Sequence, residues 1–169
     1  KIRFIPGISA GLQGAFRVTP ALDIFLEPQI SAYFNRFDGI RNQVVAGDLL
    51  LGLTYKFKNR SERYLNTEKV DNSTFVSAGV GTGVWGNTVV SRTGKVKDKL
   101  SFNADVSLGY WFNSISGVRL SFGTNTFRPA VWYDADKMTI LSLRSDYLVN
   151  LTSCFSGYDP DRLFDMIGI

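Results

Sequence analysis

Three carboxylates are the first candidates for chemistry in this sequence. Glu27, Asp105 and Asp146 could form a general acid–base set, in which one carboxylic acid donates a proton and another carboxylate accepts one. The same parts of the chain carry Arg119 and Arg144, and a neighbouring guanidinium favours the ionised form of a carboxylate. The chain contains no histidine, the usual general base near neutral pH. We therefore expect no catalytic residues and no enzyme.

Two other patterns resemble ligand sites. Gly79, Gly81 and Gly83 alternate as in a phosphate-binding loop, but no Lys-Ser pair follows them, so we interpret them as small residues of a strand. Asp134 and Asp136 could bind calcium, but two carboxylates are too few for a site. With no histidine and a single cysteine, no transition-metal cluster is expected. The sequence predicts neither a metal nor a cofactor.

Composition excludes several classes of protein. Of the 169 residues 44% are hydrophobic, yet no run reaches the roughly 18 apolar residues of a transmembrane helix. The net charge of +4 is not gathered into a basic stripe, so nucleic acid is not an expected partner. One cysteine cannot build a disulfide framework. The aromatic content of 14% and the 16 glycines favour strands and turns.

Apolar and polar residues alternate along most of the chain, which is the pattern of two-faced strands. It is clearest over 100–112, where the even positions are all apolar or aromatic and the odd positions are mostly polar or small. No charged residue falls on the apolar face of any of the first seven strands, although 20% of the chain is charged. The expected strands are 8–18, 22–35, 45–57, 76–84, 100–112, 118–126, 139–151 and a short one from 163 to 169.

Eight strands with a charge-free face predict an eight-stranded antiparallel transmembrane β-barrel with up-and-down meander topology. The apolar faces would meet lipid and the other faces would line the lumen, which is only wide enough for side chains to fill. Four positive and five negative residues would then form a paired charge network that plugs it. This network comprises Arg17, Asp23, Glu27, Asp48, Lys56, Asp105, Arg119, Arg144 and Asp146.

Strand ends and connections complete the pattern. Aromatic residues near strand ends predict an interfacial girdle. Connections alternate between short, at 19–20 and 113–117, and long, at 36–43, 87–99 and 128–137, as in outer-membrane barrels. Pro28 would delete a ladder hydrogen bond and so predicts a bulge. The girdle residues are Phe16, Phe34, Tyr55, Phe57, Phe102, Tyr110 and Phe112.

Short motifs add a family resemblance. The run 53–57, which ends in Tyr55-x-Phe57, resembles the strand-closing signal that outer-membrane barrels present to their assembly machinery. Segment 35–57 resembles the final hairpin of the OmpA-like outer-membrane β-barrel family, a family of porin-type small barrels. Segment 111–120 resembles the first hairpin of these barrels, and segment 146–162 resembles the middle one. The resemblance implies an integral protein of the Gram-negative outer membrane whose partners are outer-membrane lipid, the barrel assembly machinery and other envelope proteins.

The order of these parts departs from that family. Residues 1–59 resemble the end of a barrel and 74–169 its start, with 60–73 as a periplasmic linker. A permuted barrel, a fragment of two tandem barrels and a mis-ordered partial chain would all give this order. We expect 1–169 to form one barrel.

The expected role is in envelope integrity or as a narrow pore, including as a subunit of a larger envelope complex. The alternative is a soluble lipocalin-like barrel whose apolar faces surround a small apolar ligand.

Overall fold

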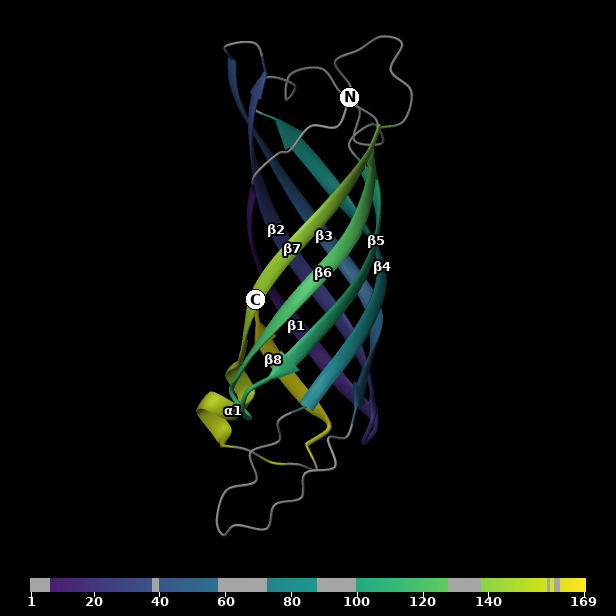
Figure 1. Ribbon diagram of the computed structural model, residues 1–169, viewed down its shortest axis with the longest axis vertical. Helices are drawn as coiled ribbons and strands as arrows, with labels where there is room; N and C mark the ends of the chain where they lie inside the picture. The colour runs from purple at the N-terminus through teal and green to yellow at the C-terminus, as the bar shows by residue number, and fades with distance from the viewer. Residues whose placement is uncertain are drawn as a thin grey trace.

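The computed structural model describes residues 7–37, 40–57, 73–87, 100–127, 138–157, 159 and 162–169. These residues form eight antiparallel strands in one sheet that closes on itself in the order β1 to β8, which confirms the all-β meander (Figure 1). The strands are β1 (Gly7–Thr19), β2 (Leu22–Phe37), β3 (Ile40–Phe57), β4 (Ser73–Asn87), β5 (Leu100–Trp111), β6 (Ser116–Phe127), β7 (Met138–Asn150) and β8 (Phe164–Gly168).

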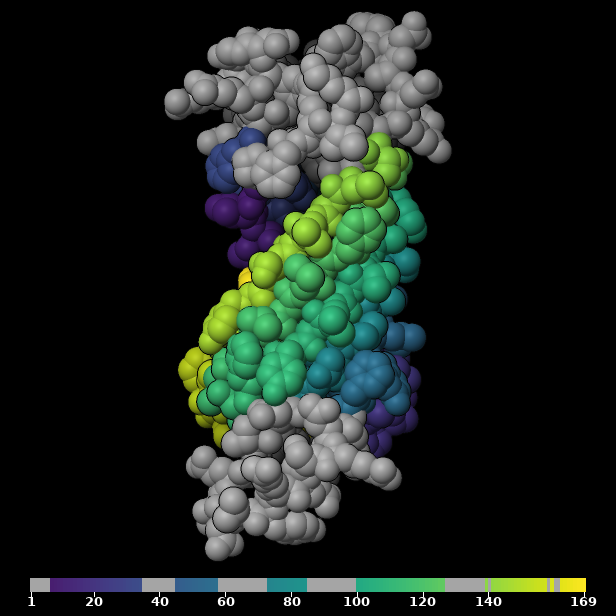
Figure 2. All heavy atoms as spheres, in the orientation of Figure 1, coloured from purple at the N-terminus to yellow at the C-terminus, as the bar shows by residue number. Residues whose placement is uncertain are grey.

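The burial of side chains follows the alternation in the sequence. In β5, Ser101 and Asn103 are buried, whereas Phe102, Val106 and Leu108 are 60%, 56% and 55% exposed. A strand sends successive side chains to opposite faces, so the polar face of β5 lines the inside of the closed sheet and the apolar face covers the outside. Figure 2 shows β5, β6 and β7 as oblique bands that lie side by side and cover one side of the barrel.

The connection between β2 and β3 differs from the expectation. The ladder between these strands is continuous from Leu22↔Tyr55 to Phe37↔Ile40, so the long loop expected over 36–43 is wrong. The dipeptide Asp-Gly at 38–39 lies between the two strands, and Asp-Gly is a sequence typical of two-residue hairpins. The polar residues in this range led us to expect a loop, but they continue the strand pattern to its end.

Pro28 does not introduce a bulge, which corrects the expectation for β2. The register between β1 and β2 is the same at Gly11↔Gln29 and at Gly14↔Leu26, on both sides of Pro28. Pairing is simply interrupted between these two positions, because proline has no N–H to donate to the ladder. The register instead shifts between Arg17 and Thr19, next to the turn.

A short helix follows β7 at the lower end of the barrel in Figure 1. This helix, α1 (Leu151–Ser156), was not predicted, because we expected strand seven to include Leu151. Asn150 caps it: its side-chain oxygen accepts a hydrogen bond of 2.9 Å from the backbone N–H of Ser153. None of the described helices has the length and apolar character required to cross a membrane.

Two of the short connections lie at the same lower end. β1 and β2 are joined through Pro20 and Ala21, and between β5 and β6 the Asn113 side chain accepts hydrogen bonds from the backbone N–H groups of Ile115 (2.8 Å) and Ser116 (2.7 Å). The expected linker at 60–73 lies outside the described residues, apart from Ser73 at the start of β4. So do the long connections expected at 87–99, apart from Asn87 at the end of β4, and at 128–137.

Close packing inside the barrel gives a first prediction. Gly109 on β5 lies opposite Phe75 on β4, and a methyl group at Gly109 would overlap the Phe75 ring. Gly109→Ala should therefore lower the free energy of unfolding by about 1–3 kcal/mol, measured by equilibrium urea unfolding. Gly47→Ala is the matched control, because a methyl group at Gly47 would have no atom within 4 Å. Equal effects of the two substitutions would contradict this packing.

Candidate functional site: the charged interior of the barrel

Arg119 on β6 lies at the centre of a buried ion-pair network, and its side chain is 2% exposed. Its guanidinium donates two hydrogen bonds to Glu27 on β2, with Nη1–Oε2 and Nη2–Oε1 distances of 2.8 and 3.0 Å. Its Nε also donates to Oδ2 of Asp146 on β7, at 2.9 Å. The two-pronged geometry toward Glu27 is the strong form of an arginine–carboxylate pair.

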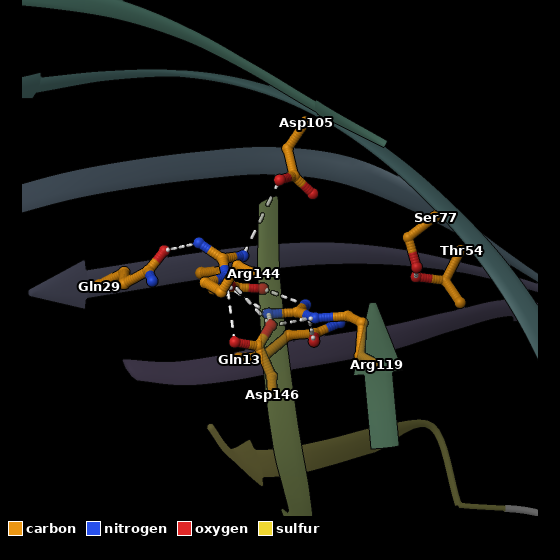
Figure 3. Close-up of polar contacts among 9 residues, drawn as sticks. Gln13, Gln29, Thr54, Ser77, Asp105, Arg119, Arg144 and Asp146 are labelled. Atoms are coloured by element: carbon orange, nitrogen blue, oxygen red, sulfur yellow. Dashed lines mark hydrogen bonds and ion pairs between the residues drawn. The ribbon is translucent and has the colours of Figure 1, made fainter. Parts of the chain in front are cut away.

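Arg144 on β7 extends this network (Figure 3). Its Nε lies 3.0 Å from Asp146, and its Nη1 donates a 2.7 Å hydrogen bond to Oε1 of Gln29 on β2. Its Nη2 lies 3.8 Å from Glu27 and 3.9 Å from Asp105 on β5. One cluster therefore joins side chains from β2, β5, β6 and β7.

The network crosses the interior from wall to wall. In a closed ring of eight strands β2 and β6 are four strands apart in both directions, so Glu27 and Arg119 extend from opposite sides. Gln13 on β1 also contacts the Arg119 guanidinium, at 3.4 Å. The interior of an eight-stranded barrel is only wide enough for side chains to fill. The network therefore fills the cross-section of the barrel at the level of Arg119.

The other charged residues of the interior have polar neighbours of their own. Asp48 on β3 accepts a 2.6 Å hydrogen bond from Asn103 on β5, which reaches past β4 because Gly83 has no side chain to block it. Lys56 contacts Asp23 at 2.5 Å, with Lys56 24% exposed and Asp23 6% exposed. Arg17 lies opposite Asp23 in the β1–β2 ladder and is half-buried.

The nine charged residues singled out from the sequence therefore all lie on inward-facing strand positions. The structure brings Glu27, Asp105, Arg119, Arg144 and Asp146 into one cluster. Asp48 lies beside this cluster, opposite Gln29 in the β2–β3 ladder, and Lys56 and Asp23 form a separate pair. The sequence analysis missed the neutral amides that complete the network. They share the inward phase of the charged residues, which is the pattern that could have identified them: Gln13, Gln29 and Asn103.

The interior is also less polar than expected. Phe25, Phe75 and Leu148 are all 5% exposed or less, and Phe75 and Leu148 form a buried apolar cluster with Ala15 and Ile167. The signal was present in the sequence, because Phe25 is two residues from Asp23 and therefore faces the same side of β2. The barrel is filled by a layer of apolar packing as well as by charges.

The arrangement does not favour acid–base catalysis. The carboxylates of Glu27 and Asp146 are engaged by guanidinium N–H groups, so their chemistry here is ion pairing. Among the described residues no group of three or more His, Cys, Asp or Glu side chains could hold a metal ion.

The outer surface of the barrel is apolar along its middle. Leu49, Leu51, Val106 and Leu120 are 44%, 54%, 56% and 53% exposed. In the strand segments for which side-chain burial is described, 7–34, 45–57, 73–84, 100–111, 116–126 and 139–150 without 140, no outward-facing position carries a charged side chain. This surface is the reverse of an ordinary water-soluble exterior.

The aromatic residues singled out from the sequence lie near both ends of the barrel, in unequal numbers. All are at least 45% exposed except Tyr110, which is half-buried. Two ring pairs stack edge to face at the lower end, Tyr55 with Phe57 at 5.0 Å and Tyr110 with Phe112 at 5.6 Å between centroids. The lower end carries Phe16, Tyr55, Phe57, Tyr110 and Phe112, and the upper end carries Phe34 and Phe102.

Comparison with known proteins adds no relative: no family model matches the chain, and no match was found among curated proteins or among solved structures. The resemblance to OmpA-like barrels therefore stays a prediction from sequence motifs, and the site is interpreted from its own geometry.

The central ion pairs give a second prediction. Arg119→Leu should leave Glu27 and Asp146 buried without their main cation and lower the free energy of unfolding by about 3–5 kcal/mol. Lys56→Leu is the control, because Lys56 is partly exposed to solvent and Asp23 keeps Arg17 opposite it in the β1–β2 ladder, so this substitution should cost clearly less than Arg119→Leu. Urea midpoints of the two variants test this, and a cost for Arg119→Leu no larger than that of the control would contradict it.

Proposed function

We propose that this chain is an integral β-barrel of the Gram-negative outer membrane, with a role in envelope integrity and at most a narrow pore. The observation that supports the proposal is the inverted distribution of side chains: apolar residues cover the outside of the barrel and an ion-pair network fills its inside.

The exposed apolar surface is the first argument. Leu143, Ile8 and Ile30 are 74%, 68% and 66% exposed, and many further large apolar side chains on every strand are at least 38% exposed. Soluble monomers seldom expose contiguous apolar patches beyond a few hundred Å². In hydrocarbon the same surface is favourable, and a closed ring of strands satisfies the backbone hydrogen bonds that lipid cannot.

Strand length supports the same proposal. A tilted strand needs about 9–11 residues to cross the hydrocarbon core. The shortest of the first seven strands, β5 and β6, have 12 residues each. A lipocalin-like carrier, the alternative, requires its apolar faces to point inward around a ligand, which is the opposite of what β5 shows.

The proposed pore is narrow because charged side chains cross it. Solutes would have to pass the Arg119 guanidinium and its two carboxylate partners, Glu27 and Asp146. We therefore place the structural role first and conduction second.

The proposed partners are outer-membrane lipid, the barrel assembly machinery and other envelope proteins. The exposed Tyr55 and Phe57 rings at the end of β3 are the proposed contact for the assembly machinery. In this barrel β3 is paired on both sides, with β2 and β4, so that part of the proposal depends on the motif alone.

The membrane proposal predicts the effect of a charge on the outer surface. Leu51→Arg and Leu108→Arg should each lower the free energy of unfolding in lipid bilayers by about 2–4 kcal/mol, because both positions lie well within their strands. Val18→Arg, near the end of β1, is the control and should cost about 0–1 kcal/mol, since the interface tolerates charge. The unmodified chain should partition into detergent and migrate on gels in a heat-dependent manner. A monomer that stays soluble without detergent would overturn the membrane assignment.

The pore proposal predicts the effect of removing the central pair. In planar bilayers the unmodified barrel should conduct ions weakly, and the double variant Glu27→Ala/Arg119→Ala should conduct more, because two side chains that cross the interior are shortened. Thr54→Ala/Ser77→Ala removes another buried inward pair, joined at 3.0 Å, and is the control with little expected change. Unchanged conductance in the first variant would leave only the structural role.

A further inference from the structure

The inward residues change from charged to apolar just below the Arg119 network, toward the lower end of the barrel in Figure 1. On β2, which rises from that end, the inward residues in order are Asp23, Phe25 and Glu27. On β7, which descends to it, they are Asp146, Leu148 and Asn150. Phe25 is 4% exposed and Leu148 is 1% exposed, and each lies two residues from a carboxylate of the network. An apolar level therefore lies directly below the charged one, with polar residues on its far side.

This apolar level crosses the interior from wall to wall. Phe75 on β4 packs in one buried cluster with Ala15 on β1, Leu148 on β7 and Ile167 on β8. In the closed ring β4 and β8 are four strands apart in both directions, so Phe75 and Ile167 extend from opposite sides. Trp111 on β5 packs against the cluster, and its ring centroid lies 6.2 Å from that of Phe75.

The apolar level also runs around the whole ring of strands. Where a strand contributes glycine to it, an aromatic ring from a neighbouring residue lies where the side chain would be. These glycines and rings are Gly52 on β3 with Phe25, Gly109 on β5 with Phe75, and Gly117 on β6 with Trp111. All eight strands therefore take part. We call the side chains at this level the apolar layer, which comprises Ala15, Phe25, Phe75, Trp111, Leu148 and Ile167.

We propose that the apolar layer is a second barrier across the interior, which stops ions and polar solutes even where the Arg119 network has opened. An ion must give up water to enter an apolar constriction, and the aliphatic and phenyl side chains of the layer offer no hydrogen bonds in exchange. The inference deepens the proposed pore function and rests on the proposed membrane location, because a barrier matters only in a barrel that spans a bilayer.

The two barriers differ in kind. The network consists of guanidinium and carboxylate groups, so a hydrated ion that reaches it finds charged and hydrogen-bonding partners. The apolar layer is only one residue thick, since polar inward residues flank it on β1 as well as on β2 and β7. On β1 the inward residues in order are Gln13, Ala15 and Arg17. Opening the network alone should therefore raise conduction only a little, and opening both barriers should raise it much more.

Planar-bilayer conductance tests the proposal in the Glu27→Ala/Arg119→Ala barrel, in which the network is already shortened. Adding Phe75→Ala removes a ring that crosses the layer, and the conductance should rise by about tenfold over that of the double variant. Adding Leu50→Ala is the matched control, because Leu50 on β3 is a similarly buried inward residue outside the layer. The control should leave the conductance of the double variant nearly unchanged.

A second variant changes the polarity of the layer and leaves its packing volume nearly intact. In the same background Leu148→Asn places an amide among the apolar side chains, which should raise the conductance by about threefold because water can then enter. Leu50→Asn is its control, at a position 5% exposed against 1% for Leu148, and should have little effect. Heat-modifiable migration is measured on every variant, and Leu148→Asn decides the question if the Phe75→Ala barrel does not fold.

The outcomes separate this proposal from the proposed pore. Folded barrels in which neither Phe75→Ala nor Leu148→Asn conducts more than its control would overturn the barrier, and the layer would then serve packing alone. If the unmodified barrel and Glu27→Ala/Arg119→Ala are both silent but the added Phe75→Ala conducts, the barrier is supported and native conduction is disproved. A chain that stays soluble without detergent would overturn the membrane proposal and the barrier with it.

Discussion

The barrel depends on the ion pairing of Arg119 with Glu27 and Asp146 across its interior. A guanidinium buried to 2% exposure is tolerable only with full hydrogen bonding, and the two carboxylates come from strands on the far and the adjacent wall. The pairing therefore constrains the diameter of the ring and the register of β2, β6 and β7 together. It also accounts for the polar inward residues that contact the two arginines, Gln13 and Gln29.

The remaining interior is arranged around that network. Glycines on β4 and β5 make room for long side chains from neighbouring strands: Gly83 lets Asp48 reach Asn103, and Gly109 lies under Phe75. These large inward side chains lie beside glycines, which have no side chain, and the narrow interior is therefore closely packed. Gly83 is also one of the three alternating glycines that mimic a phosphate-binding loop, and all three lie in strand β4, as we interpreted from the sequence.

Much of the fold could be predicted because period-two alternation is a local property. The faces of β5, and the inward placement of all nine charged residues, follow from that alternation alone. Which residues pair could not be predicted, since Arg119 and Glu27 are 92 positions apart and their contact depends on ring closure. The α1 helix was missed because its only signal in the sequence is the Asn150 cap. The burial of Phe25 and Leu148 was missed because the charged residues on the same faces led us to expect a wholly polar interior.

A ring of strands has no beginning. Because β8 pairs with β1, the arrangement of the closed sheet does not depend on which strand comes first in the chain. The order of the strands along a chain can therefore be circularly permuted, and each strand still keeps the same two neighbours in the sheet. The strand order predicted from the sequence motifs, with strands that resemble the end of a barrel first, is therefore compatible with one closed sheet.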